Sequence, residues 1–360
     1  MAIRPDDAAV LAKELREMFS EAESVLLQRI ARAIAKGMEA PDWAEQKLLN
    51  IQALNREVAA ILLDLQNGVP GAVERAIGLA YNRGVATAGT ELTAAGLKHG
   101  AFAEVQPTGA ASSIVSETLA RLQPMSFQIR RAVSDIYQQV VTQVAAQTTL
   151  GTVTRREASQ MILGRLAKNG ITGFRDAAGR NWEMASYAEM AARTSSAQAM
   201  LQGHTDRIQE LGVDTVIVSN APEECKICRP FEGRVLSLSG RTTGKLKDGR
   251  TVMASLAQAR RDGLYHPNCR HSHSIYLPGI TKGPGRDTAD PAGDELRQTQ
   301  RDLERNIRTL KRKEIMMREI GGPAAVKAKA DLGAARAEFK DWREANDRKD
   351  LAYRTSLKAR

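Results

Sequence analysis

Apolar side chains in the first 150 residues recur every three or four positions, which is the period of one face of an α-helix. The pattern is clearest over residues 25–34 and 48–62. Hydrophobic residues make up 42% of the chain, enough to bury a core, but aromatic residues only 4%. Such a composition suits helices that pack through small and straight-chain side chains. It predicts a mainly α-helical protein and argues against an all-β sandwich.

Glycine and proline interrupt this periodicity, and each interruption predicts the end of a helix. The interruptions lie at residues 37–41, 67–70, 96–109 and Pro124. The helices between them are expected to form a bundle or hairpin domain over residues 1–150. These helices are expected to pack in antiparallel fashion within the chain or on neighbouring subunits. The second arrangement predicts an oligomer formed through the N-terminal helices.

Residues 151–278 are expected to form a smaller α+β module. Thr154 and Glu157 have the spacing of a capping box, which predicts a helix from there to about residue 168. A second helix is expected over 184–211.

Strand patterns follow these helices. β-Branched residues predict a strand at 213–219, and weaker patterns lie at 235–238 and 274–277. The glycine- and lysine-rich stretch 240–249 lacks the spacing of a phosphate-binding loop, so we interpret it as a flexible basic loop.

The last part of the chain is highly charged. Residues 279–294 are rich in glycine and proline and predict a linker. Residues 295–360 carry two charged helical patterns with thin apolar stripes, separated at 321–323. We therefore expect a basic, helical C-terminal tail.

All three cysteines of the chain lie between residues 225 and 269. Their spacing is Cys225-x2-Cys228, then 37 residues, then His266-x2-Cys269. Two ligand pairs of this kind are typical of tetrahedral Cys3His coordination of Zn²⁺. Four protein ligands leave no open position, so the zinc would stabilise the α+β module and would not activate water.

Several alternatives remain for this segment. His271 and His273 are additional or substitute ligands, and His271 could also support a ligand by a hydrogen bond. In a second alternative no metal is bound, the three cysteines are simply buried thiols, and the histidine lies on the surface. An HNH-type nuclease would use His266, Asn268, His271 and His273, but that fold needs a ββα arrangement. A catalytic Cys–His pair and a Cys-x2-Cys redox site also lack their usual surroundings, so no catalytic residue is predicted.

Positive charge is concentrated in two parts of the sequence. The net charge is +10, with +7 in residues 225–275, +6 in 281–360 and −3 in 1–224. Basic side chains there are expected to bind DNA phosphates without sequence preference and with salt-sensitive affinity. For the tail, an ordinary solvated helix face explains the charge equally well. The candidates for DNA contact are Arg241, Lys245, Lys247, Arg250, Arg260, Arg261, Lys311, Arg312 and Lys313.

The chain has no apolar run of 18 residues, and its first ten residues lack the apolar core of a signal peptide. These features predict synthesis in the cytoplasm and no membrane association.

Several motifs together resemble those of the phage minor capsid protein 2 family, which is related to the Mu F-type minor head proteins. They occur in the family's order and comprise the stretches 179–182, 187–194 and 212–219, then Cys225 and Cys228 with Glu232 and Gly233, and finally His266-Pro-Asn-Cys-Arg-His271. The family often has cysteine where this chain has His271.

The resemblance implies a structural minor protein in the head of a tailed phage or prophage. It implies association with portal and major capsid proteins and with packaged double-stranded DNA, and no catalytic residues. The alternative is an HNH-like nuclease or toxin-like effector carried in the head. A host DNA-binding regulator is disfavoured because the sequence has no helix-turn-helix signature.

Overall fold

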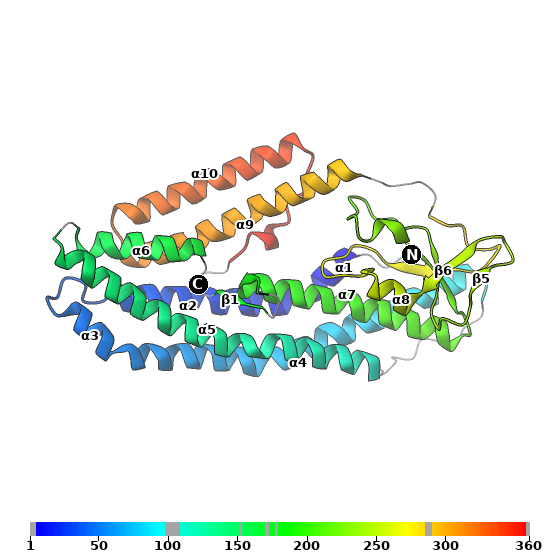
Figure 1. Cartoon of the computed structure of the whole chain (residues 1–360), viewed down its shortest axis with the longest axis horizontal. Coiled ribbons are helices and arrows are strands. Elements are labelled where there is room, and N and C mark those ends of the chain that lie inside the picture. Colours follow the sequence, from blue (N-terminus) through cyan, green and yellow to red (C-terminus); the bar gives the residue numbers. More distant parts are fainter. Residues whose placement is uncertain are drawn as a thin grey trace. The chain divides into compact units, whose positions relative to one another are not determined.

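The computed structural model describes residues 5–97, 109–151, 153–169, 173–176, 179–284 and 290–357 (Figure 1). The fold is mainly α-helical with a small sheet module, which confirms the predicted class. The helices are α1 (Pro5–Leu11), α2 (Lys13–Ala35), α3 (Trp43–Leu49), α4 (Ile51–Ala94), α5 (Gly109–Thr149), α6 (Arg155–Asn169), α7 (Met184–Glu210), α8 (Leu256–Arg261), α9 (Pro291–Ile320) and α10 (Pro323–Ala345), with short 3₁₀ turns η1 (Arg229–Phe231) and η2 (Ala352–Arg354).

Two of the predicted helix ends are wrong, because α4 continues through Pro70 and α5 continues through Pro124. A proline inside a helix removes one backbone hydrogen bond and costs about 3 kcal/mol. Burial on both sides offsets this cost, since Val69 and Val73 flank Pro70, and Leu122 and Met125 flank Pro124, all almost completely buried. Each such side chain contributes about 1.5–3 kcal/mol when buried.

Other predicted ends are confirmed. Helix α2 ends at Ala35, Gly37 adopts a φ of +66°, and α3 begins at Trp43. Helix α4 ends at Ala94, and most of the predicted break at 96–109 lies outside the described residues.

The capping box at the start of α6 forms as predicted. The backbone N–H of Glu157 donates to Thr154 Oγ1 at 3.2 Å, and the N–H of Thr154 donates to Glu157 Oε2 at 2.9 Å. The hydrogen bonds that the backbone N–H and the hydroxyl of Thr154 donate to the Glu157 carboxylate lower the pKa of Glu157. The reciprocal pair satisfies backbone donors that the helix itself leaves open.

The strands form two sheets. In the first, β1 (Gly173–Arg175) pairs antiparallel with β2 (Asn181–Glu183). The second contains β3 (Thr215–Val218), β4 (Val235–Ser237), β5 (Gly244–Lys245), β6 (Thr251–Ser255) and β7 (His273–Ile275), in the order β5-β6-β4-β3-β7. Its neighbours are antiparallel except for β4 and β6, which are parallel.

The strands expected at 213–219, 235–238 and 274–277 are present, whereas the interpretation of 240–249 as a flexible loop is corrected. This stretch contains β5, and β5 and β6 form a hairpin that the sequence analysis missed. Leu246 at the hairpin turn packs against a buried cluster of Ile217, Val235 and Tyr276, and this contact holds the turn on the sheet.

The chain divides into two compact units, each built from three segments of sequence. Unit 1 comprises Met1–Leu15, Pro70–Arg121 and Glu189–Arg297, and unit 2 comprises Arg16–Val69, Leu122–Ala188 and Gln298–Arg360. The separate domains expected over 1–150 and 151–278, the linker at 279–294 and the tail at 295–360 remain predictions.

Within unit 1, helices α4 and α7 approach so closely that both need glycine at the contact. A Cβ atom on Gly84 would lie 1.9 Å from the carbonyl oxygen of Met200, and one on Gly203 would lie 2.2 Å from that of Tyr81. No side chain fits at such distances. This contact fixes the position of α7, whose Thr205 hydroxyl lies 3.2 Å from Nε2 of His273 in β7.

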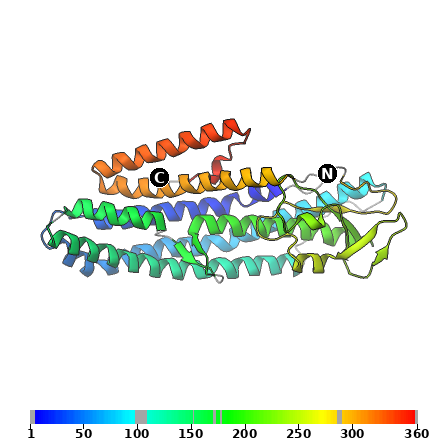
Figure 2. The same cartoon turned by 45° about the horizontal axis from the view of Figure 1, so that its top comes forward.

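Within unit 2, helices α9 and α10 lie side by side (Figure 2). Their thin apolar stripes meet in a small core of Ile307, Leu332, Ala335 and Phe339. The stripe that looked sparse in the sequence is therefore sufficient for a two-helix contact.

Candidate metal centre

Two loops of unit 1 carry the predicted ligand pairs, and the pairing of β3 with β7 brings these loops together. The strands are antiparallel, with Val218 opposite His273. The loop that leaves β3 therefore meets the loop that enters β7 at the same end of the sheet. The first loop carries Cys225 and Cys228, and the second carries His266 and Cys269.

Tight turns direct the two residues of each pair to one side. In the first loop, the backbone N–H of Cys228 donates to the carbonyl of Cys225 at 3.2 Å. In the second, the N–H of Cys269 donates to the carbonyl of His266 at 2.9 Å, and Asn268 adopts a φ of +66°. Asparagine tolerates this left-handed backbone better than most residues.

The ligand atoms lie close enough together to hold a metal ion. Cys225 Sγ is 3.0 Å from His266 Nε2, Cys228 Sγ is 3.4 Å from Cys269 Sγ, and Cys269 Sγ is 3.5 Å from His271 Nδ1. Two groups are compact, namely Cys225 with Cys228 and His266, and Cys228 with Cys269 and His271. In tetrahedral zinc sites, bond lengths place neighbouring ligand atoms about 3.5–3.8 Å apart. We call these five residues the Cys/His cluster.

Both histidines of the cluster have the surroundings of a metal ligand. While one ring nitrogen faces a sulfur, the other is held by an oxygen: His266 Nδ1 lies 2.8 Å from the carbonyl of Pro267, and His271 Nε2 lies 2.7 Å from Glu232 Oε1. Ligating histidines in proteins almost always make this second hydrogen bond. The donor set therefore fits a metal ion, with either histidine as the nitrogen ligand.

The charges in the cluster favour a cation. A hydrogen bond from Cys228 lowers the pKa of the Cys269 thiol, with further support from His271. The pKa of Cys228 is raised, because this thiol donates its hydrogen bond to the Cys269 sulfur and is buried. Burial lowers the pKa of His271, but Cys269 and Glu232 outweigh it and the net shift is upward. A bound metal ion would take the place of these shared protons.

His273, predicted as an additional or substitute ligand, lies outside both groups. It is fully buried; Tyr265 Oη lies 2.8 Å from its Nδ1, and Thr205 Oγ1 lies 3.2 Å from its Nε2. Both ring nitrogens are thus engaged within the protein. Burial lowers the pKa of His273, so the ring is neutral.

Two acidic residues that contact buried histidines of unit 1 were not predicted from the sequence. Glu232 holds His271. Glu91 accepts a hydrogen bond from the backbone N–H of Ile275 at 2.9 Å and lies 3.1 Å from another buried histidine, His204. The only signal for Glu232 was its place in the family motif. Nothing in the helical pattern around Glu91 indicated a contact 113 residues further along the chain.

The basic residues predicted to contact DNA fall into two sets. The side chains on the β5–β6 hairpin and on α8 are exposed, namely Arg241, Lys245, Lys247, Arg250, Arg260 and Arg261. Those on α9 are engaged in the fold, since Lys311 donates to the carbonyl of Thr355 at 2.6 Å and Lys313 pairs with Asp331 at 3.1 Å.

The prediction for Arg312 is corrected. Its side chain is buried, and it forms ion pairs with Glu23 at 2.8 Å and with Glu183 at 3.4 Å. A guanidinium in this position holds α9 within unit 2 and is not available to DNA.

The fold and the site together define a mainly helical protein whose small sheet module carries a Cys/His cluster able to hold a metal ion. A family model described as phage minor capsid protein 2 matches residues 3–344. The chain therefore belongs to the phage minor capsid protein 2 family. Searches of curated proteins and of solved structures found no match. None of the described helices has the length and apolar character needed to cross a membrane.

Proposed function

We propose that this minor capsid protein is a structural component of the phage head whose sheet module is stabilised by one zinc ion. The observation that carries the metal proposal is the meeting of two Cys/His loops at one end of the β3–β7 pair. Three sulfur ligands and one imidazole match the donor set of structural zinc sites. With four protein ligands the ion has no position for water, so its contribution is to the stability of the fold.

The ligand set that we propose is Cys225, Cys228, His266 and Cys269. These residues form two symmetric pairs, one from each loop. His271, held by Glu232, would then hydrogen-bond the Cys269 sulfur and stabilise its thiolate. Such contacts around a metal centre orient the ligands and adjust their charge.

Family membership supports a place in the virion, after synthesis in a bacterial host. We propose that the protein contacts portal and major capsid proteins there, and that exposed basic residues on the sheet module contact packaged DNA. These side chains would bind phosphates and would not read bases.

Metal analysis of the purified protein tests the zinc proposal. We expect about one zinc per chain, with Cys228→Ser losing the metal and melting at a lower temperature. Met253→Ser is the control, because Met253 lies on the same sheet but is exposed; this variant should keep its zinc. Full zinc content in Cys228→Ser would contradict the proposed site.

The structural role predicts no cleavage of DNA. Plasmid DNA incubated with the protein and with Mg²⁺, Mn²⁺ or Zn²⁺ should remain supercoiled. Metal-dependent nicking that disappears in a folded His271→Ala variant would instead favour the nuclease alternative.

A further inference from the structure

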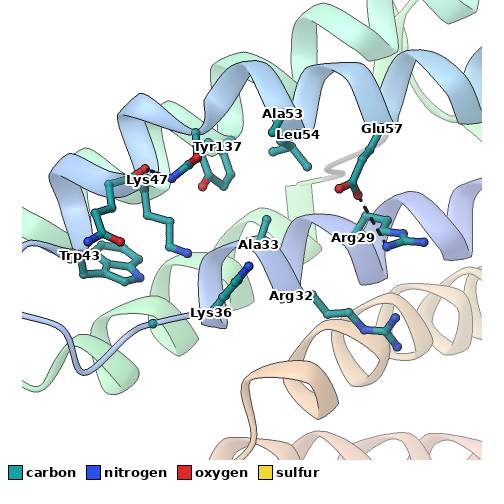
Figure 3. Close-up of a pocket in the computed structure, with 13 residues that line it drawn as sticks. Arg29, Arg32, Ala33, Lys36, Trp43, Lys47, Ala53, Leu54, Glu57 and Tyr137 are labelled. Carbon is teal, nitrogen blue, oxygen red and sulfur yellow. Dashed lines mark hydrogen bonds and ion pairs between the residues drawn. The ribbon is translucent and has the colours of Figure 1, made fainter.

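A pocket in unit 2, separate from the Cys/His cluster, is lined by an unusual number of cations (Figure 3). It has a volume of about 450 Å³ and lies among α2, α3, α4 and α5. Four basic side chains line it, whereas Glu57 is the one acidic residue among its described lining. We call it the basic pocket. Its basic residues are Arg29, Arg32, Lys36 and Lys47.

Carboxylates neutralise only the two arginines. Arg29 pairs with Glu57 at 3.6 Å, and Arg32 pairs with Glu319 through two contacts of 2.7 and 3.1 Å. Among the described residues, neither Lys36 nor Lys47 has an acidic partner within ion-pair distance. The pocket therefore keeps two uncompensated positive charges.

Lys47 is the more informative of the two lysines. Its side chain is only 8% exposed, and Figure 3 shows it reaching from α3 towards the end of α2, which Lys36 directly follows. Burial and the nearby charge of Lys36 lower the pKa of Lys47 to about 8. A buried ammonium without a counter-ion is costly, and proteins rarely keep one unless an anion is bound there.

The other lining groups suit an oxyanion. The hydroxyl of Tyr137 lines the pocket from α5 and has no hydrogen-bond partner among the described residues. It can donate to an oxygen acceptor beside the two ammonium groups. The indole N–H of Trp43 already donates to the carbonyl of Ile34 at 3.0 Å, so this side chain contributes only its apolar surface.

We propose that the basic pocket binds a small free oxyanion of the phosphate class, held between the ammonium groups of Lys36 and Lys47. A doubly charged phosphate would neutralise both lysines, and its oxygens can accept from both ammoniums and from the Tyr137 hydroxyl. A DNA duplex is a poor occupant, because Lys47 is buried and a polymer backbone cannot enter a pocket of this size.

Isothermal titration of inorganic phosphate into the full chain tests this proposal. We expect saturable binding to the unmodified protein and at least a tenfold loss of affinity in both Lys47→Met and Lys36→Met. Lys329→Met is the control, because Lys329 is an exposed lysine on α10 of the same unit; it should bind phosphate like the unmodified protein.

The two lysine variants keep the test decisive. Lys36 is exposed, so its variant is expected to fold even if Lys47→Met does not, and thermal melting of each variant checks this. Absence of phosphate binding to the unmodified protein, or equal affinity in Lys36→Met, would overturn the proposal. So would loss of duplex DNA binding in Lys36→Met without any binding of free phosphate, which would make the pocket a nucleic-acid contact.

Discussion

Two buried basic side chains, Arg312 and Lys47, have pKa values shifted in opposite directions. Arg312 is buried but has two carboxylate partners, whose attraction raises its pKa against the effect of burial. Lys47 is buried and is repelled by the charge of Lys36, and its pKa falls. The first arrangement stabilises the charged form, and the second leaves a charge that folding disfavours.

Lys47 should make stability depend on pH. Its pKa is about 8 in the folded chain and 10.5 in its ordinary state, so the unfolded chain binds more protons between these values. The free energy of unfolding should therefore rise with pH from about 8 to 10.5, by up to roughly 3 kcal/mol from this group. Urea denaturation at pH 7.5 and pH 10 measures the rise.

The matched comparison is Lys47→Met, which should show a smaller rise than the unmodified protein. Lys311 also has a pKa lowered to about 8 by burial, so part of the rise should persist in that variant. An identical pH dependence in Lys47→Met and in the unmodified protein would show that Lys47 titrates normally.

Helices and strands were predictable from the sequence where their contacts are local, and not where they depend on burial or on pairing with another segment. The capping box of α6 was predictable, because both partners lie within four residues of each other. Pro70 and Pro124 were wrongly predicted to end helices, since the burial that keeps α4 and α5 intact cannot be read from the local sequence. Strands β5 and β6 are defined by their pairing, and a two-residue strand has no periodicity to detect.

The Cys/His cluster shows the same division. Sequence spacing identified Cys225, Cys228, His266 and Cys269, because each pair sits in one turn. It could not show how Glu232 holds His271 or that His273 is enclosed by Tyr265 and Thr205, because these contacts join side chains from separate parts of the fold.

The crossing of α4 and α7 should be intolerant of a single methyl group. In Gly203→Ala the new Cβ would lie 2.2 Å from the carbonyl oxygen of Tyr81, so the helices must separate. We expect a loss of at least 1–3 kcal/mol in unfolding free energy, the usual cost of overpacking. Chemical denaturation followed by circular dichroism measures it.

Gly78 provides the control for this substitution. It lies in α4, and a Cβ there would meet no atom within 4 Å. Gly78→Ala should be neutral or should stabilise the protein by up to about 1 kcal/mol, because alanine favours the helix. Equal effects of the two substitutions would mean that the close contact is absent in solution.

For the whole molecule, the position of positive charge matters more than its sum. The sequence suggested two basic regions, but the structure leaves only the sheet module with a group of exposed basic candidates, since Lys311, Arg312 and Lys313 are engaged within unit 2. Any DNA contact should therefore depend on the sheet module.

A quadruple variant of the hairpin residues tests this dependence, with Arg241, Lys245, Lys247 and Arg250 each changed to Gln. Each lost phosphate contact should reduce the slope of log affinity against log salt concentration by about 0.9, and duplex binding should weaken at every sequence tried. Fluorescence anisotropy with labelled duplexes at several salt concentrations measures both effects.

The control removes the same charge from exposed positions of α10, with Lys327, Lys329, Arg336 and Lys340 changed to Gln. This variant should keep most of the salt dependence. If both variants lose the same affinity, binding would depend on net charge alone and the sheet module would have no special role.

The two halves of the Cys/His cluster also impose an order on the zinc binding that we propose. Cys225 and Cys228 are synthesised before His266 and Cys269, so a chain that ends between the two pairs offers only half of the proposed ligands. The full set meets only after β7 has paired with β3 at the far side of the sheet. Tight metal capture would thus report that the sheet module is complete, and chains truncated before residue 266 would be left without this stabilisation, as preferred targets for proteolysis.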